Sequence, residues 1–277
     1  MASIAEEPAT RADTSTMNRW LLALMVGGLS SFPCLAQPSA PAAQPASQAL
    51  DTGTDPTRFS RVAEAKFEYL DLRGGSSSNT WRLSFTQPLG EKRDYSIRFR
   101  MPITSSDVRG YPGYGAGDGS VQLAHVFGLT PHHGFVAQGE LIFDTASRPE
   151  LGTGKNTFKG TLIYARFLEN GSIFAPAFVQ NTSLWGDADR PRVNVTTLDF
   201  YYVPKFEDPR TLMTFDPALN FDWTNDKRFF SLQVTAGRVV GSVLGGNLIA
   251  FVKPSVFAGG DRPSSWGIEV GVKILGF

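Results

Sequence analysis

The sequence predicts an all-β protein, a transmembrane antiparallel up-and-down β-barrel of about 12 strands. Three observations predict this fold. The chain opens with an export signal, most of it alternates between apolar and polar side chains in segments of about ten residues, and tryptophans lie near the ends of such segments.

The export signal covers residues 1–36. A positively charged start at Met17 leads into an apolar stretch from Leu21 to Phe32. A membrane-spanning helix needs roughly 20 apolar residues, so this stretch is too short and is typical of a signal peptide. We expect cleavage after Ala36.

Composition limits what the rest of the chain can do. The 277 residues include 26 Lys and Arg against 26 Asp and Glu, so there is no basic excess that would attract nucleic acid. The only cysteine, Cys34, lies in the signal peptide, and we therefore expect no disulfide and no thiolate metal site in the mature chain. Residues 1–16 have no pattern of their own and are interpreted as an extension upstream of a start at Met17.

Residues 37–57 form a linker rich in Pro, Ala, Ser and Gln, a composition that cannot bury a core. We expect a flexible periplasmic spacer here, and a plug inside the barrel is the alternative. The barrel itself is expected to cover residues 58–277.

The alternation is clearest over residues 213–223. Odd-numbered positions such as Phe215 and Phe221 are apolar, and most even-numbered ones, such as Asp216, are polar, so one face suits lipid and the other suits water. Residues 95–101 repeat the pattern and contain Arg98 and Arg100. An arginine on the lipid face costs about 2–4 kcal/mol near the midplane, so both arginines should point inward.

The same alternation sets the expected strands, and turn residues separate them. With both chain ends periplasmic, the longest connections, 104–118, 146–156 and 184–192, all fall on the outer side. The expected strands are 61–72, 79–88, 93–103, 119–128, 134–145, 157–168, 172–183, 193–205, 210–224, 228–239, 246–258 and 265–277.

Aromatic residues give an independent check on this register. Trp81, Trp223 and Trp266 share parity with the apolar face and lie at the outer ends of their strands, where we expect a belt at the membrane interface. The final Phe277 resembles the aromatic carboxy-terminus that the barrel-assembly machinery reads. It has the opposite parity to the apolar face of its strand, so we predict a bulge at Gly276.

Charged residues of both signs share the inward parity. A soluble β-sandwich is the alternative to a barrel, but its dry interior could not accept so many charges. The predicted lumen-lining residues are Glu64, Lys66, Glu68, Arg82, Arg98, Arg100, Glu140, Asp144, Asp216, Asp222, Lys253, Glu269 and Lys273.

Two glycine-rich segments, Gly115–Ala124 and Phe143–Lys155, resemble the Gly-x-Gly-Asp strand opening and the Leu-Gly-x-Gly loop of the transporter-like barrel family named after the meta-pathway of phenol degradation. Outside residues 115–168 the resemblance is limited to barrel-like alternation, and the family's Pro-Thr-Gly is replaced here by Asp144-Thr145-Ala146. The resemblance implies a place in the outer membrane of a Gram-negative bacterium and uptake of hydrophobic or aromatic small molecules. It implies no catalytic residue.

An outer-membrane lipid-modifying enzyme is a competing interpretation, and it would need a serine and a histidine on one face. Ser120 and His125 are five residues apart and therefore point to opposite faces of one strand. His132 and His133 lie in a short periplasmic turn, where solvated side chains are expected. The sequence therefore predicts neither a catalytic residue nor a cofactor.

Loop residues offer other sites only weakly. The glycine-rich segment 110–119 is followed by a strand, whereas a phosphate loop needs a following helix, and Gly154-Lys155-Asn156 lacks the Ser or Thr and the earlier glycine of a nucleotide loop. Both segments are interpreted as flexible outer loops. Asp187, Asp189 and Asp261 could bind calcium or bridge lipopolysaccharide, but solvated loop charge is the default, so no metal site is predicted.

The sequence therefore favours a passive outer-membrane channel or transporter for small solutes. Eight strands give a filled interior and 16–18 an open pore, so we expect a narrow lumen, partly closed by its own ion pairs and by a loop carrying Tyr111 and Tyr114. Arg82, Arg98 and Arg100 would form a positive ladder along the solute path. A closed structural or surface-interaction barrel is the second hypothesis. The expected partners are outer-membrane lipid and lipopolysaccharide, the assembly machinery and a small solute.

Overall fold

The computed structural model describes residues 50–107 and 113–277. The signal peptide, residues 37–49 of the linker and Tyr111 lie outside the described residues. Within the described ranges no helix is long and apolar enough to cross a membrane. The strands are β1 (Val62–Leu72), β2 (Ser77–Leu89), β3 (Tyr95–Ser106), β4 (Gly115–Ala116), β5 (Ser120–Phe127), β6 (His133–Ile142), β7 (Lys155–Phe167), β8 (Ile173–Gly186), β9 (Asn194–Val203), β10 (Thr211–Asp222), β11 (Lys227–Val243), β12 (Gly246–Ala258) and β13 (Ser264–Leu275).

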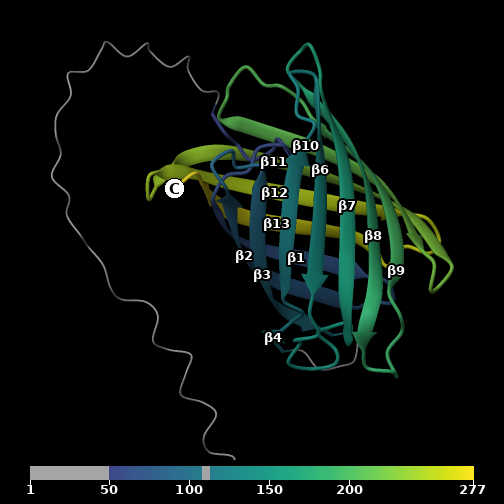
Figure 1. Cartoon of the computed structure of the whole chain (residues 1–277). Helices are drawn as coiled ribbons and strands as arrows, with labels where there is room; N and C mark the ends of the chain where they lie inside the picture. The colour runs from purple at the N-terminus through teal and green to yellow at the C-terminus, as the bar shows by residue number, and fades with distance from the viewer. Residues whose placement is uncertain (1–49, 108–112) are drawn as a thin grey trace, which may run out of the picture. The chain divides into compact units, whose positions relative to one another are not determined.

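These strands form one closed antiparallel sheet (Figure 1). Long strands that follow one another in the chain pair with each other, and β1 pairs with β13 as well as with β2, which closes the ring. The two-residue β4 pairs only with the end of β3, so it is not one of the strands that form the barrel wall. The predicted all-β up-and-down barrel of twelve long strands is therefore confirmed.

Strand boundaries agree with the predicted ones to within a few residues, with one clear exception. The expected six-residue connection between β11 and β12 is wrong, because β11 continues to Val243 and only Leu244 and Gly245 form the turn. Both turn residues have positive φ values, 53° and 82°. Such two-residue hairpins usually contain Asn-Gly or Asp-Gly, and a leucine in the first position gives no turn signal.

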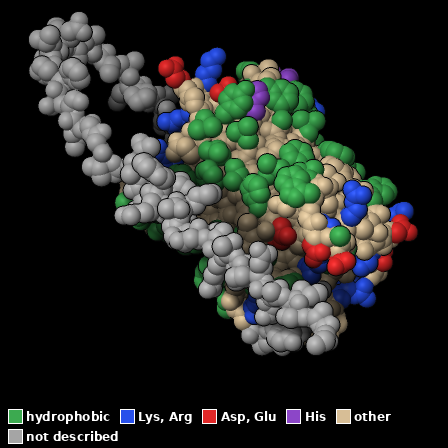
Figure 2. Space-filling model, turned by 60° about the horizontal axis from the view of Figure 1, so that its bottom comes forward, with side chains coloured by type: hydrophobic (Ala, Val, Ile, Leu, Met, Phe, Trp, Pro, Cys, Tyr) green, Lys and Arg blue, Asp and Glu red, His purple; other side chains and the backbone are tan. Residues whose placement is uncertain are grey.

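Apolar side chains cover the outside of the wall, and Figure 2 shows them gathered over one face, with charged side chains near its ends. On β2 the outward set is Trp81, Leu83 and Phe85, each at least 40% exposed. Soluble proteins rarely expose so much contiguous apolar surface, whereas a barrel in lipid must do so. The outer wall is therefore a lipid-facing surface.

The three predicted belt tryptophans lie on this outer face and are exposed. Trp81 contacts the ring of Phe67 at 5.1 Å between centroids, and Trp266 contacts Tyr69 at 5.2 Å. The indole N–H of Trp223 donates to Thr196 at 2.8 Å. Their place at a membrane interface remains a prediction.

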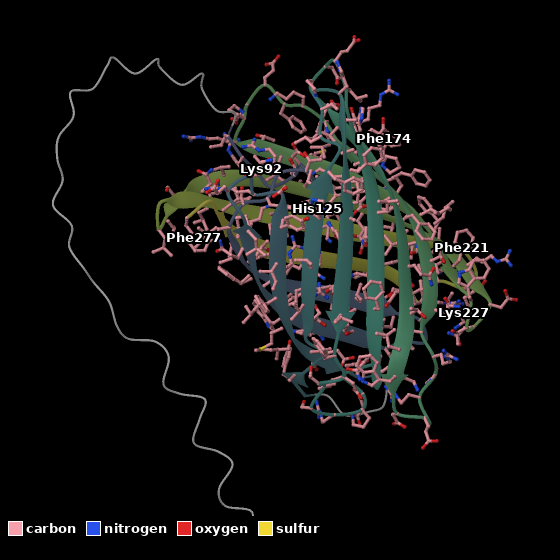
Figure 3. The ribbon with its side chains drawn as sticks, in the orientation of Figure 1. Lys92, His125, Phe174, Phe221, Lys227 and Phe277 are labelled. Carbon is pink, nitrogen blue, oxygen red and sulfur yellow. The ribbon has the colours of Figure 1, made fainter. Side chains whose placement is uncertain are left out.

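The two ends of the barrel differ in the length of their connections. One end, called the inner end here, holds the start of β1, the end of β13 and the shorter turns; the outer end holds the three long connections. In Figure 3, Lys92 and Phe277 lie at the inner end, and Phe221 and Lys227 at the outer one. This distribution is the one expected when short turns face the periplasm.

The inner end is tied together by side chains from its turns. In the β9–β10 turn, the backbone N–H of Arg210 and the guanidinium of Arg238 hold the pKa of the exposed Asp208 carboxyl below its ordinary value. At the C-terminus, the guanidinium of Arg61 lies 5.8 Å from the centre of the Phe277 ring and donates to the Phe277 carbonyl at 3.2 Å.

The alternation of inward and outward side chains is interrupted at Gly276, as predicted, but by a turn after the strand and not by a bulge within it. The strand β13 has already ended at Leu275, and Gly276 adopts a left-handed conformation with a φ of 79°. Its N–H donates to the carbonyl of Arg61 at 2.8 Å. The change of direction brings Phe277 to the outward-facing Phe85, with 6.5 Å between the ring centroids.

Candidate functional site

The candidate site is the barrel lumen, which contains a cavity of about 720 Å³. Strands β1, β2, β3, β6 and β13 supply most of its wall, and residues 53–60 and the outer connections close its two ends. Seven Lys or Arg side chains and four Asp or Glu side chains line it, an excess of three positive charges. Of the predicted lumen residues, those on this cavity wall are Glu64, Lys66, Arg82, Arg98, Arg100, Glu140 and Lys273.

One group of charges is organised around Glu140 on β6, which is 2% exposed. Its carboxylate accepts from Lys159 Nζ at 2.7 Å and from Ser120 Oγ at 2.6 Å, and it also pairs with Arg100. Arg100 donates in addition to Gln122 at 2.9 Å. Four strands, β3, β5, β6 and β7, are therefore connected through a single buried carboxylate.

A second group is organised around Glu269 on β13, which is 3% exposed. Its carboxylate lies 2.9 Å from Lys66 Nζ, 3.5 Å from Lys253 Nζ and 3.6 Å from Arg82 Nη1. Arg82 also pairs with Glu68 at 3.1 Å. The predicted ladder cations Arg82 and Arg100 are therefore largely neutralised by acids of the same wall.

Three lumen cations differ from the others, and one of them is the exposed Arg58 of the N-terminal segment, which has no ion pair among the described residues. Arg98 on β3 and Lys273 on β13 line the cavity, and no carboxylate of the described residues lies within ion-pair distance of either. Arg98 donates through Nε to Thr86 Oγ1 at 2.8 Å. The described part of the lumen therefore has three cations without an ion pair, and Arg98 and Lys273 are the two that lie on the barrel strands.

Three predicted lumen acids are not on the wall of this cavity. Asp144 is exposed in the connection after β6, because this strand ends at Ile142 rather than at residue 145. Asp222 accepts from the N–H groups of Thr224 and Asn225, both at 3.1 Å, and so caps the β10–β11 turn. Asp216 shares the inward parity of the buried Thr214 and Ala218 on β10, and it lies next to Asp199 of β9 in a part of the interior outside this cavity.

Sequence reasoning missed Lys159, which lines the cavity and pairs with Glu140. The signal was present, because on β7 Lys159 shares parity with Thr157 and Thr161, while the outward Phe158 and Leu162 have the other parity.

Residues 50–60 fold across the inner end of the lumen. Leu50 packs against an apolar cluster on the inner wall, formed by Leu212, Val239, Ile249 and Leu275. The carbonyl of Thr54 accepts from Tyr201 on β9 at 3.1 Å, and Thr57 is 6% exposed beside Gly134 of β6. The segment therefore contacts three sides of the wall.

This placement corrects the expectation of a flexible spacer for residues 50–57. The Pro, Ala and Ser bias of the linker ends before this stretch, which supplies Leu50 for the apolar cluster and carboxylates that fix its turns. Asp51 accepts from Gly53 N–H at 2.9 Å and from Ser60 Oγ at 2.6 Å, and Asp55 accepts from Thr57 N–H at 2.8 Å.

The outer connections pack against one another at the other end of the cavity. Asp118 accepts from the N–H of Thr153 at 2.8 Å and from that of Ala146 at 3.2 Å. Arg190, from the next outer connection, donates to the carbonyls of Gly152 at 2.6 Å and Pro149 at 2.8 Å. The described parts of these connections are therefore held by hydrogen bonds, and the expectation of flexible loops is wrong for them.

The two glycine-rich segments of the sequence meet in this outer cap. A Cβ atom on Gly152 would lie 2.5 Å from Asp118 Oδ1 and 2.5 Å from the Cβ of Ala146, which leaves no room for a side chain. Gly115 is equally confined, since its Cβ would lie 2.4 Å from Ser147 Oγ. These glycines thus allow close contact between two loops.

The histidines lie on the outer wall or at the inner end, away from the serine considered as a nucleophile. His125 faces outward and stacks on the ring of Tyr95 with 4.1 Å between centroids (Figure 3 shows its place on the wall). Ser120 points inward and donates to Glu140. The two side chains therefore lie on opposite faces of β5 and cannot form a nucleophile–base pair.

Comparison with solved structures places this barrel among known folds. The COG4313 outer membrane channel from Pseudomonas putida F1 has a TM-score of 0.61 at 13% identity, over 82% of this chain and 99% of that one. The KdgM porin has a TM-score of 0.55 at 10% identity, over 77% and 98%, and the NanC porin 0.54 at 8%, over 78% and 99%. The fold is that of an outer-membrane β-barrel.

No protein-family model and no curated protein sequence matches the chain. The similarity to the porins is therefore one of fold. Together with the apolar outer wall and the charged lumen, it gives this chain the fold of a bacterial outer-membrane β-barrel.

Proposed function

We propose that this barrel is a passive channel for small hydrophilic solutes across the outer membrane. The observation that carries the proposal is the cavity of about 720 Å³ inside the wall, lined by charged and polar side chains. A barrel whose only role is structural would fill its interior with packed side chains, as small barrels do. A charged cavity is instead a place that water and a solute can share.

The size of the cavity limits the solute. Binding cavities for drug-sized molecules range from roughly 300 to 1,000 Å³, so this one suits a single small molecule. The charged wall favours polar solutes over the hydrophobic ones that the resemblance to the phenol-degradation family implies. An aromatic solute fits only if it also carries a charge, because Phe59 is the one aromatic ring among the described residues of the cavity wall.

Liposome swelling tests the proposal. Purified mature protein in liposomes should give swelling with glycerol and with small organic acids, and the rate should fall steeply as the solute grows to a disaccharide. Single-channel recordings in planar bilayers provide a second measurement. Heat-denatured protein is the control, and the absence of both swelling and current would favour the closed structural barrel.

Interactions with the membrane are part of the same proposal. Trp81, Trp223 and Trp266 would lie near the headgroups of lipid and lipopolysaccharide, where the ring is apolar and the N–H remains solvated. The C-terminal Phe277 would be the residue that the assembly machinery recognises. No catalytic residue, cofactor or metal is proposed.

A further inference from the structure

We infer that Arg98 and Lys273 form a binding subsite for small anions, carboxylates above all, in the lumen. This assignment rests on the proposed channel function and deepens it by naming the class of solute. The observation behind it is that some cations of the inner wall have ion pairs and others have none.

Ion pairs neutralise most of the lumen cations on the strands. Arg82, Lys66 and Lys253 share Glu269, and Arg100 and Lys159 share Glu140. The two acids are almost fully buried, so they are reached mainly by these partners. With Glu64 and Glu68 counted, the Glu269 group has three cations and three acids and is neutral, whereas the Glu140 group has two cations and one acid and keeps a single positive charge.

Arg98 is held in a position that leaves most of its guanidinium available. Its Nε donates to Thr86 Oγ1 at 2.8 Å, which fixes the plane of the group. The two Nη atoms have no hydrogen-bond partner among the described residues, and they belong to a side chain on the cavity wall. Two free N–H-bearing nitrogens in one plane are the arrangement that binds a carboxylate through both oxygens.

Lys273 provides the second charge from the other side of β1 and β2. Its ammonium lies at the floor of the cavity, 3.1 Å from the position that a Cβ on Gly53 would take. Arg98 and Lys273 are near enough for their charges to repel each other. Glu64 attracts both cations, Glu140 also attracts Arg98 and Asp51 also attracts Lys273, but each acid acts from beyond ion-pair distance. An anion between the two cations would remove that repulsion.

The surroundings limit which anion fits. Phe59 and Pro56 from the N-terminal segment and Leu275 from β13 give the floor an apolar part beside the two cations. A carboxylate on a small apolar or aromatic body can satisfy both features. Benzoate and acetate are suitable probes, since they share the carboxylate and differ in the ring.

Benzoate binding to the detergent-solubilised barrel, measured by calorimetry, tests the subsite without requiring conduction. Arg98→Gln and Lys273→Gln should each weaken benzoate binding about tenfold, the loss expected for one charge-assisted contact. Lys159→Gln removes the same charge from the same cavity, but there Glu140 loses only one of two cations, so a several-fold smaller loss is expected. Lys227→Gln, at the exposed outer start of β11, should leave the affinity unchanged.

Reversal potentials in a potassium chloride gradient give the second readout. The native barrel should prefer chloride, and the two key variants should lose most of that preference. Equal losses of benzoate affinity in Arg98→Gln, Lys273→Gln and Lys159→Gln would show a diffuse positive field and overturn the subsite. Benzoate binding that depends on Arg98 and Lys273 in a barrel without any current would keep the subsite and overturn the channel.

Discussion

At the scale of single residues, the lumen depends on two buried carboxylates that each serve several cations. Glu140 and Glu269 are both at most 3% exposed, and each has more than one partner of opposite charge. Breaking such a group by removal of the shared acid leaves several cations near one another without compensation. The two glutamates are therefore expected to matter more for stability than any single cation.

Replacing Glu140 with glutamine should lower the free energy of unfolding by about 3 kcal/mol, the lower end for a broken buried pair. The amide cannot neutralise Arg100 and Lys159, although it still accepts a hydrogen bond. Denaturant unfolding in lipid vesicles, followed by tryptophan fluorescence, measures the change. Glu91→Gln in the exposed β2–β3 turn is the control, and equal stability of the two variants would contradict the role of Glu140.

Parity along each strand was enough to predict which way most charged residues point, and it also applies to the overlooked Lys159. It failed at strand ends. Asp144 lies beyond the last residue of β6, where side chains no longer alternate, and Asp222, the last residue of β10, accepts hydrogen bonds from the following turn. The partners of each charge could not be predicted. They depend on which strands are neighbours across the ring and on long side chains that reach over two strands.

At the scale of structural elements, the outer cap depends on close contact between its loops. Gly152→Ala should loosen the cap, because the added Cβ would lie 2.5 Å from Asp118 Oδ1 and would displace a carboxylate that holds two backbone N–H groups. We expect proteolysis of the 142–155 connection in intact vesicles to become severalfold faster. Gly260→Ala is the matched control, since nothing lies within 4 Å of the Cβ added there. Similar cleavage rates for the two variants would contradict this account.

The N-terminal segment, residues 50–60, leads to a prediction of a different kind. Tyr201→Phe removes the hydrogen bond to the Thr54 carbonyl and should increase the time that the segment spends away from the wall. A cysteine at position 57 reports this, because Thr57 is 6% exposed whereas the adjacent Arg58 is exposed. In the native background Thr57→Cys should react with a maleimide at least tenfold more slowly than Arg58→Cys. Tyr201→Phe should narrow that difference, and equal labelling of both cysteines in the native background would show that the segment does not stay on the wall.

Sequence composition described this segment poorly for a physical reason. The linker as a whole cannot build a core, but Leu50 needs only a small apolar cluster that the barrel already provides. Its remaining polar groups are satisfied by one another and by Tyr201. A segment that packs onto an existing surface does not need a periodic pattern of apolar residues. Its amino-acid composition therefore does not show that it is ordered.

At the scale of the whole molecule, alternating polarity predicted a closed barrel. A strand with one charged and one apolar face needs water on one side and lipid on the other. In a sandwich the charged face would be dry, and in an open sheet in lipid the edge strands would lack hydrogen-bond partners. Closure satisfies both conditions, and the pairing of β1 with β13 provides it. The cavity was not predictable in the same way, since twelve strands are compatible with a filled or a hollow interior.

The outer wall gives a last prediction, because the cost of a charged side chain there depends on its depth in the bilayer. Leu83 lies at the middle of β2 and is 46% exposed, and Leu89 lies at the inner end of the same strand and is 39% exposed. An arginine near the bilayer midplane costs about 2–4 kcal/mol and one near the interface about 0–1 kcal/mol. Leu83→Arg should therefore lose several times more unfolding free energy in phospholipid vesicles than Leu89→Arg. If both variants unfolded at the same denaturant concentration, the wall around β2 would not be in contact with the hydrocarbon core.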